Sequence, residues 1–285
     1  MKAYRSMLAG QKAMIHHANH LPPVYSDTNG HEIYFLTGKK YLYQTLFCIA
    51  SLNRQSSVPI QYVLVDDGSF DTNLISRVRA KLPGCRLVLA KEIMSNLEKQ
   101  LPARDFPILH KKREEYAHIK KLTDIHTILS ASPYKLVLDS DMLFWQPPLE
   151  LINWMQKPAS SVYMVDCEES YGYTKSFMAE LCGHIIPDLV NVGIIGLNST
   201  TINWYHLEHW IKRLEAQEGT CYYLEQALTA MLVAGQTAEI LHKNKYIVNP
   251  DMKEINQPQA IMHHYVDLSK YGYYTLAWQK IFRDN

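Results

Sequence analysis

The stretch Lys135-Leu136-Val137-Leu138-Asp139-Ser140-Asp141 decides the fold prediction for this chain of 285 residues. Its first half is a short apolar run after Pro133, which is typical of a buried strand. The strand ends in two carboxylates separated by one residue. If residues 139–141 stay extended, Asp139 and Asp141 point to the same side of the chain and can hold a divalent cation together. A turn or a helix cap after the strand is the competing interpretation.

A second apolar run ends in the same way. Tyr62-Val63-Leu64-Val65 leads into Asp66-Asp67-Gly68-Ser69, and a strand is also predicted over residues 33–36. Helical spacing over residues 39–54, and again after Asp71, separates these runs, so the rhythm predicts parallel β-α-β units. Ligands of open α/β sheets bind beyond the carboxyl ends of the strands. The two acidic strand ends are therefore predicted to meet in one crevice.

The remaining elements fit one α/β domain. Further strands are predicted over 86–89, 161–165 and 191–197, and further helices over 111–130, 204–216 and 224–233. The sequence shows no repeat, no low-complexity segment and no linker. We therefore expect a single catalytic domain over residues 31–285, with a mostly parallel central sheet flanked by helices, and a peripheral segment over residues 1–30.

Composition excludes several classes of protein. The formal net charge is only +1, from 29 basic and 28 acidic residues, so no nucleic-acid partner is expected. The five cysteines form no C-x-x-C pair, which argues against a disulfide framework or a zinc knuckle and favours the cytoplasm. No signal peptide is recognisable, and no apolar run reaches the roughly 18 residues of a membrane span. Any membrane contact would then be peripheral.

The D-x-D stretch resembles that of glycosyltransferases with the GT-A fold, a Rossmann-like α/β architecture. The segment Val63-Leu64-Val65-Asp66-Asp67-Gly68-Ser69 resembles the strand that contacts the nucleotide in those enzymes. The resemblance implies a nucleotide-sugar donor and Mn²⁺ or Mg²⁺ as cofactor. It also implies that Asp139 contacts ribose and metal, that Asp141 binds the metal, and that Asp66 and Asp67 contact the nucleotide.

Three later stretches are similar to glycosyltransferase family 8, the glycogenin-like retaining enzymes. They are Leu189-Val190-Asn191-Val192-Gly193, Tyr223-Leu224-Glu225-Gln226 and Ile261-Met262-His263-His264-Tyr265. The first resembles an Asn-x-Gly strand that lines the donor sugar, which implies sugar contacts by Asn191 and Gly193. The second implies catalytic roles for Gln226 and for Glu225, which stands where the family has Asp. The third resembles the late histidine that is the third metal ligand, assigned here to His263 in preference to His264.

Two more positions follow by analogy with these enzymes. Thr37, at the end of the first strand, is expected to contact the nucleobase or ribose, or else to cap a helix. Lys120, on the helix before the D-x-D strand, is expected to face the donor.

The resemblance implies metal-dependent transfer of a hexose from a nucleotide diphosphosugar, with UDP favoured, to a hydroxyl of a sugar or glycan acceptor. Retention of configuration is favoured, and a membrane-linked acceptor would be reached by peripheral contact. The Asp-Asp-Gly-Ser segment also resembles the inverting family 2, which would need a carboxylate base such as Asp166, Glu168, Glu169 or Asp188. A sugar nucleotidyltransferase and a non-catalytic nucleotide-binding protein are also compatible with the sequence.

Overall fold

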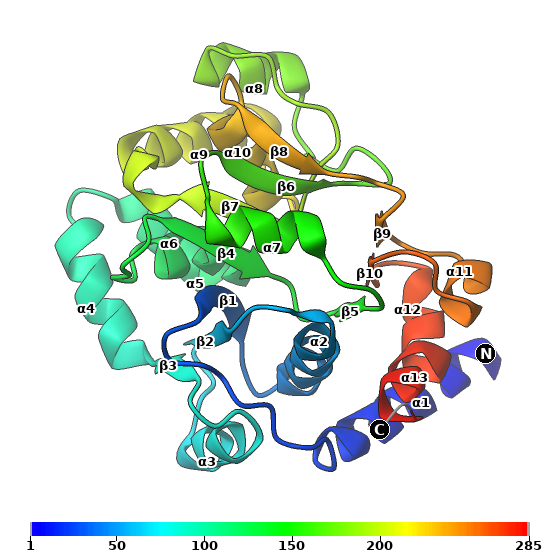
Figure 1. Ribbon diagram of the computed structural model, residues 1–285. Helices are drawn as coiled ribbons and strands as arrows, with labels where there is room; N and C mark the ends of the chain where they lie inside the picture. Colours follow the sequence, from blue (N-terminus) through cyan, green and yellow to red (C-terminus); the bar gives the residue numbers. More distant parts are fainter. Residues whose placement is uncertain (1, 284–285) are drawn as a thin grey trace.

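A seven-stranded central sheet organises the protein, which a computed structural model describes over residues 2–283 (Figure 1). Its strand order is β3-β2-β1-β4-β7-β6-β8. The strands are β1 (His31–Thr37), β2 (Ile60–Asp66), β3 (Arg86–Val88), β4 (Tyr134–Leu138), β6 (Ser161–Val165), β7 (Val190–Asn198) and β8 (Ala238–Leu241). Only β7 runs antiparallel to its neighbours in this sheet. The predicted mostly parallel α/β sheet is thus confirmed.

Helices cover both faces of the sheet. They are α1 (Lys2–Ala18), α2 (Leu42–Gln55), α3 (Thr72–Lys81), α4 (Ala90–Gln100), α5 (Pro107–Glu115), α6 (Lys120–His126), α7 (Leu149–Gln156), α8 (Lys175–Cys182), α9 (Trp204–Glu218), α10 (Leu224–Val233), α11 (Met252–Asn256), α12 (Ser269–Gly272) and α13 (Trp278–Arg283). Short turns of helix are η1 (Ala117–Ile119), η2 (Ser199–Thr201) and η3 (Tyr273–Ala277).

Alternate side chains of the central strands enter two separate hydrophobic cores. In β1, Ile33 and Phe35 belong to one core and Tyr34 belongs to the other. In β4, Leu136 and Leu138 belong to the first core and Val137 belongs to the second. Side chains that alternate across a sheet buried on both faces must be apolar at nearly every position. This is why these strands read as continuous apolar runs in the sequence.

A second, three-stranded sheet lies next to the end of β4. It consists of β5 (Met142–Phe144), β10 (Met262–His264) and β9 (Tyr246–Val248), in the order β5-β10-β9. Strand β5 follows Asp141 directly, and β10 pairs antiparallel with it, so that His264 lies opposite Met142. The backbone N–H of Tyr265 donates to the carbonyl of Asp141 at 2.9 Å. The small sheet therefore brings a late segment of the chain beside the D-x-D residues.

The prediction of one continuous helix over residues 111–130 is wrong, because the helix is interrupted. Tyr116 is extended, with φ −140° and ψ 93°, and separates α5 from η1 and α6. Its hydroxyl donates to the carbonyl of Tyr222 at 2.5 Å, a contact that needs the chain to leave the helix. Arg113 then reaches back across the break to Asp124, with N–O distances of 2.6 and 2.8 Å. Apolar residues keep helical spacing on both sides of the break, so the sequence predicts one continuous helix.

The N-terminal helix α1 packs against η3, which lies near the C-terminus. Met14 and Ala18 are fully buried in one hydrophobic core, and α1 lies along η3 and α2, near both termini (Figure 1). The division into a peripheral segment over residues 1–30 and a catalytic domain over 31–285 stays a prediction. No helix within residues 2–283 is long and apolar enough to cross a membrane.

Candidate metal centre and adjoining polar network

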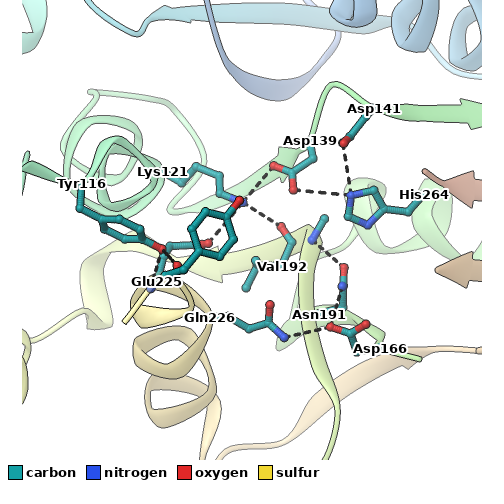
Figure 2. A network of polar contacts seen from close by, with 12 residues as sticks. Tyr116, Lys121, Asp139, Asp141, Asp166, Asn191, Val192, Glu225, Gln226 and His264 are labelled. Atoms are coloured by element: carbon teal, nitrogen blue, oxygen red, sulfur yellow. Dashed lines mark hydrogen bonds and ion pairs between the residues drawn. The ribbon is translucent and has the colours of Figure 1, made fainter. Parts of the chain in front are cut away.

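Asp139 and Asp141 lie between the end of β4 and the start of β5, and both face the ring of His264 (Figure 2). Nε2 of His264 is 3.3 Å from a carboxylate oxygen of Asp141 and 3.8 Å from one of Asp139. One ligand atom from each residue lies within 4.8 Å of the others, and no other group of this kind occurs within residues 2–283. Two carboxylates and one imidazole thus converge on a point where one cation can sit.

The hydroxyl of Ser140 holds the two carboxylates in this orientation. It lies 2.8 Å from Oγ1 of Thr45 on α2, and Thr45 in turn lies 2.7 Å from Oγ1 of Thr37. The backbone N–H of Asp139 donates to the carbonyl of Gly193 at 2.8 Å. Ser140 and Asp141 form a bend between β4 and β5, and the contact of Ser140 with Thr45 anchors this bend to α2.

Charges at this centre already compensate one another. Burial alone would raise the pKa of Asp141, but the hydrogen bond and charge of His264 hold it below its usual value. Burial would lower the pKa of His264, yet Asp141 and Asp139 raise it. Both shifts favour positive charge between the two carboxylates, which is where a metal ion would bind in place of the imidazole proton.

The structure corrects the preference for His263 over His264. Nδ1 of His263 accepts a hydrogen bond from Nε1 of Trp145 at 2.9 Å, and Nε2 lies 3.0 Å from a carboxylate oxygen of Glu254. Adjacent residues of a strand point to opposite faces, so only one of the two histidines can face the aspartates. The register of β10 on β5 selects His264.

Lys121 and Glu225 extend the centre on the side of Asp139. Nζ of Lys121 is 2.9 Å from Asp139 and 3.3 Å from Glu225, and both Lys121 and Glu225 are buried. Burial would lower the pKa of Lys121, but the two carboxylates hold it above its ordinary value. Burial and the charge of Asp139 raise the pKa of Glu225 to about 7, against the opposing effect of Lys121. Oε1 of Glu225 has no hydrogen-bond partner within residues 2–283.

A second polar group joins β6, β7 and α10 through Asp166. One carboxylate oxygen of Asp166 accepts hydrogen bonds from Asn191 at 3.0 Å and from Gln226 at 2.9 Å, and the other accepts the N–H of Cys167 (Figure 2). Oδ1 of Asn191 accepts the N–H of Gly193 at 2.8 Å. The two amide side chains are therefore fixed in orientation, side by side, by one buried carboxylate.

Gly193 makes room for the metal centre. A Cβ at this position would lie 2.6 Å from ring atoms of His264, closer than such atoms approach one another. Since β7 runs antiparallel to β4, the start of β7 lies beside the end of β4, where the aspartates are. The structure thus gives Gly193 a steric role next to the imidazole.

The remaining predicted residues lie outside the cluster, and within residues 2–283 only Thr37 is linked to it, through Thr45 and Ser140. Asp66 accepts the N–H groups of Gly68 and Phe70 at 2.7 and 3.0 Å, and Asp67 binds Ser69. Thr37 is buried, bonds to Thr45 and does not cap α2, whose N-cap is Tyr41. Lys120 donates to the carbonyl of Asp67 at 2.6 Å. No hydrogen bond or ion pair within residues 2–283 joins these side chains directly to the aspartates of the metal centre.

Lys121, Asp166 and His264 are the residues that sequence reasoning missed or ranked too low. Lys121 lies one position after the predicted Lys120, and the break at Tyr116 sets the phase of α6 that turns Lys121 inward. Asp166 ends the predicted strand over 161–165. A carboxylate at a third strand end was the signal that could have included it among the site residues.

No protein-family model matches this sequence, and no curated protein sequence does. Solved structures do share its fold. Galactosyltransferase LgtC, crystallised with donor and acceptor sugar analogues, is 12% identical with a TM-score of 0.57, over 88% of this chain and 94% of its own. Mouse xyloside xylosyltransferase 1 is 14% identical with a TM-score of 0.54, over 85% of this chain and 98% of its own.

This chain has the GT-A fold. GlyE of Streptococcus pneumoniae TIGR4 also shares it, at 15% identity and a TM-score of 0.50, over 89% of this chain and 63% of its own. These three similar proteins are glycosyltransferases by name. At such identities the likeness establishes the architecture, and the chemistry must be argued from the residues.

Proposed function

We propose that this protein is a metal-dependent glycosyltransferase that moves a hexose from a nucleotide diphosphosugar to an acceptor hydroxyl, with UDP as the favoured nucleotide. One observation carries the proposal. The cluster Asp139, Asp141 and His264 adjoins a buried lysine and a carboxylate oxygen of Glu225 without a partner. A cation site beside polar groups that can bind hydroxyls is the arrangement that a nucleotide sugar requires.

The donor set at the metal centre fits Mn²⁺ better than Mg²⁺. Mg²⁺ prefers oxygen ligands alone, whereas later first-row divalent metals also accept imidazole nitrogen. Asp139, Asp141 and His264 would supply three ligand atoms and leave other positions for diphosphate oxygens. When bound there, the metal would stabilise negative charge on the departing diphosphate.

Lys121 and Glu225 are proposed to bind the donor sugar. The free Oε1 of Glu225 accepts a sugar hydroxyl, and Lys121 holds the other carboxylate oxygen in place. The same ammonium also lies close enough to Asp139 to counter charge that develops on the phosphate side. Asn191 and Gln226, held by Asp166, present fixed amides to the ring.

Retention of configuration is the stereochemistry we propose. An inverting enzyme needs a carboxylate free to take the acceptor proton. Three of the four candidate bases are engaged in this way: Asp166 already accepts three hydrogen bonds, and Glu169 and Asp188 both pair with Lys175. These engagements support a reaction in which the leaving phosphate takes the acceptor proton.

Exposed aromatic rings support a sugar or glycan acceptor. Tyr222 and Tyr223, directly before α10, are 67% and 40% exposed, and their ring centroids are 5.3 Å apart. His118 packs edge-on against Tyr222 at 5.2 Å. Aromatic faces pack on the C–H faces of sugars while the tyrosine hydroxyls remain in water. The five free cysteines support a reducing cytoplasm as the place of action.

A thermal-shift screen tests the proposal. UDP-, GDP- and dTDP-sugars are added with and without Mn²⁺ to the wild type and to Asp141→Asn. The expected result is a rise in Tm with a UDP-sugar that needs Mn²⁺ and is absent in the variant. Failure of every nucleotide sugar to stabilise the wild type in the presence of Mn²⁺ would overturn the proposal.

A further inference from the structure

The two ends of the chain form a basic surface that the proposed reaction does not use. Residues 2–26 contain no aspartate or glutamate, and neither do residues 268–282. The basic residues of these segments include Lys2, Arg5, Lys12, Lys270 and Lys280. The whole chain has a formal net charge of only +1, whereas the positive charges of these two segments have no acidic residue within the segments to balance them.

These two segments are neighbours in space. Gly10 of α1 packs so closely on the backbone of η3 that a Cβ would lie 2.2 Å from the carbonyl oxygen of Tyr274. The ring of His17 packs against Trp278 and Phe282, with centroids 5.2 and 5.0 Å away. Figure 1 shows α1 beside α12 and α13 at one side of the molecule. The charges of both ends therefore add up on one side.

Helix α1 also presents an apolar strip to solvent. Tyr4, Leu8 and Ile15 are 62%, 37% and 41% exposed, and their spacings of four and seven residues place them on one face of the helix. With a period of 3.6 residues, Lys12 and Arg5 lie about 70° further round the axis. The strip is thus bordered by basic side chains.

The basic residues and the apolar strip on the exposed face of α1 are not used within the fold. Lys2, Arg5 and Lys12 are exposed, and no ion pair joins them to a carboxylate within residues 2–283. Next to α1, Leu268 and Tyr271 at the start of α12 are 87% and 38% exposed. An exposed apolar strip bordered by unpaired positive charge fits a partner that is both anionic and apolar.

We propose that α1, together with the start of α12, docks this protein on an anionic lipid surface. Lysine and arginine side chains meet the headgroups, and Tyr4, Leu8 and Ile15 enter the boundary with the acyl chains, as in helices that lie in the plane of an interface. A nucleic acid would satisfy the charges but would leave the apolar strip in water. The lipid surface is therefore the partner that both features favour.

Docking on this side would bring the metal centre close to the membrane. The backbone N–H of Tyr265 donates to the carbonyl of Asp141, and α12 begins only four residues later, so α12 lies near the site. If the proposed glycosyl transfer holds, this position suits an acceptor anchored in the lipid. The docking itself does not depend on that reaction, since it can be measured without any nucleotide sugar.

Co-sedimentation with vesicles tests the docking. The full chain is mixed with vesicles of phosphatidylcholine and phosphatidylglycerol, or of phosphatidylcholine alone, at low and high salt. We expect binding to the anionic vesicles that weakens as salt rises. Each basic residue near an anionic bilayer strengthens binding about five-fold, so a Lys2→Gln, Arg5→Gln, Lys12→Gln variant should bind about 100-fold more weakly.

Two further variants distinguish a lipid surface from a general polyanion. Tyr4→Gln, Leu8→Gln keeps every charge and is expected to reduce vesicle binding about ten-fold or more, because it removes apolar area that would enter the bilayer, while leaving binding to a DNA duplex unchanged. The matched control Lys91→Gln, Lys99→Gln, Lys243→Gln removes three exposed lysines from other surfaces and should bind as the wild type does. Circular dichroism confirms that each variant is folded.

Any of three results would overturn the proposal. The wild type could fail to bind anionic vesicles at low salt; the Lys91, Lys99 and Lys243 variant could lose as much vesicle binding as the Lys2, Arg5 and Lys12 variant; or Tyr4→Gln, Leu8→Gln could leave vesicle binding unchanged. The last result, combined with DNA binding as tight as vesicle binding, would identify the surface as a general polyanion site. A failed vesicle experiment leaves the metal-dependent thermal shift unaffected, so failures of the two proposals are distinguishable.

Discussion

The ends of β2 and β4 look alike in the sequence and behave differently in the structure. Each strand is apolar and leads into two aspartates within three residues. Asp66 and Asp67 at the end of β2 accept hydrogen bonds from their own loop, through Gly68, Phe70 and Ser69. Asp139 and Asp141 instead face His264 and Lys121, which come from distant parts of the chain.

The difference separates a strand end whose carboxylates bind their own loop from one whose carboxylates face distant side chains. Oδ1 of Asp66 accepts the N–H groups of both Gly68 and Phe70, which directs this carboxylate toward its own loop. The carboxylates at the end of β4 are held by Ser140 and Thr45 so that they point away from local donors. If the proposed function holds, a cation is expected at the end of β4 and not at the end of β2.

The largest expected effect tests the β4 side of this comparison. Asp141→Asn removes one charge and one ligand, and because a metal contributes several kcal/mol to such a transition state, we expect kcat/KM for glycosyl transfer to fall by about 10³-fold or more. Mn²⁺ binding, followed by electron paramagnetic resonance, should weaken in parallel. Asp66→Asn is the matched control, since it keeps Oδ1 and should retain both properties. Equal loss in the two variants would contradict the distinction between the strand ends.

A smaller effect is expected when the space for His264 is filled. Gly193→Ala places a methyl group 2.6 Å from the imidazole, so the ring must shift, and Mn²⁺ affinity should fall about 10- to 100-fold, as for other changes behind metal ligands. Titration calorimetry with Mn²⁺ alone measures this. Gly196→Ala on the same strand meets Trp154 instead, and should lower stability without changing the Mn²⁺ affinity. Unchanged metal affinity in Gly193→Ala would mean that His264 does not ligate.

The role of Asp66 at the end of β2 is tested by measuring the free energy of unfolding. Asp66→Ala leaves the N–H groups of Gly68 and Phe70 without their acceptor, which should lower the free energy of unfolding by about 2 kcal/mol. Urea denaturation measures the loss. Asp66→Asn should recover most of it, because an amide oxygen replaces the lost acceptor. A variant as stable as the wild type would show that these hydrogen bonds contribute nothing.

The smallest effect concerns a buried histidine that lacks a carboxylate neighbour. Burial, with a contribution from Lys135, lowers the pKa of His126 to about 3, whereas the pKa of His264 between two aspartates is shifted upward. Below pH 6.5, His126 becomes protonated in the unfolded chain but stays neutral in the folded chain. The free energy of unfolding therefore decreases as pH decreases. Between about pH 7 and about pH 5.5 this loss is about 1 kcal/mol.

The matched variant for this prediction is His126→Asn, which does not titrate and can keep a polar contact with Ser199. Its stability should vary less with pH than that of the wild type over the same range, in parallel urea titrations. Identical pH dependence in the two proteins would show that His126 is not the group responsible.

Most of the fold and half of the site could be read from the sequence. The strands over 33–36, 62–65 and 135–138 stand out because burial on both faces demands an apolar residue at nearly every position. The D-x-D residues stand out because a carboxylate directly after such a strand must lie at a sheet edge. The break at Tyr116 was missed, since amphipathic spacing continues across it and Tyr116 bonds to Tyr222, which is distant in the sequence.

By itself, the sequence determined the α/β sheet, the acidic end of β4 and the late histidine pair, because these depend on local periodicity and on residue type. Only the tertiary structure decided that His264 and not His263 meets the aspartates, that Lys121 and not Lys120 enters the network, and that Asp66 serves its own loop. Each of those choices rests on strand register, helix phase or a partner many residues away. Such long-range geometry is set by packing, which no local pattern encodes.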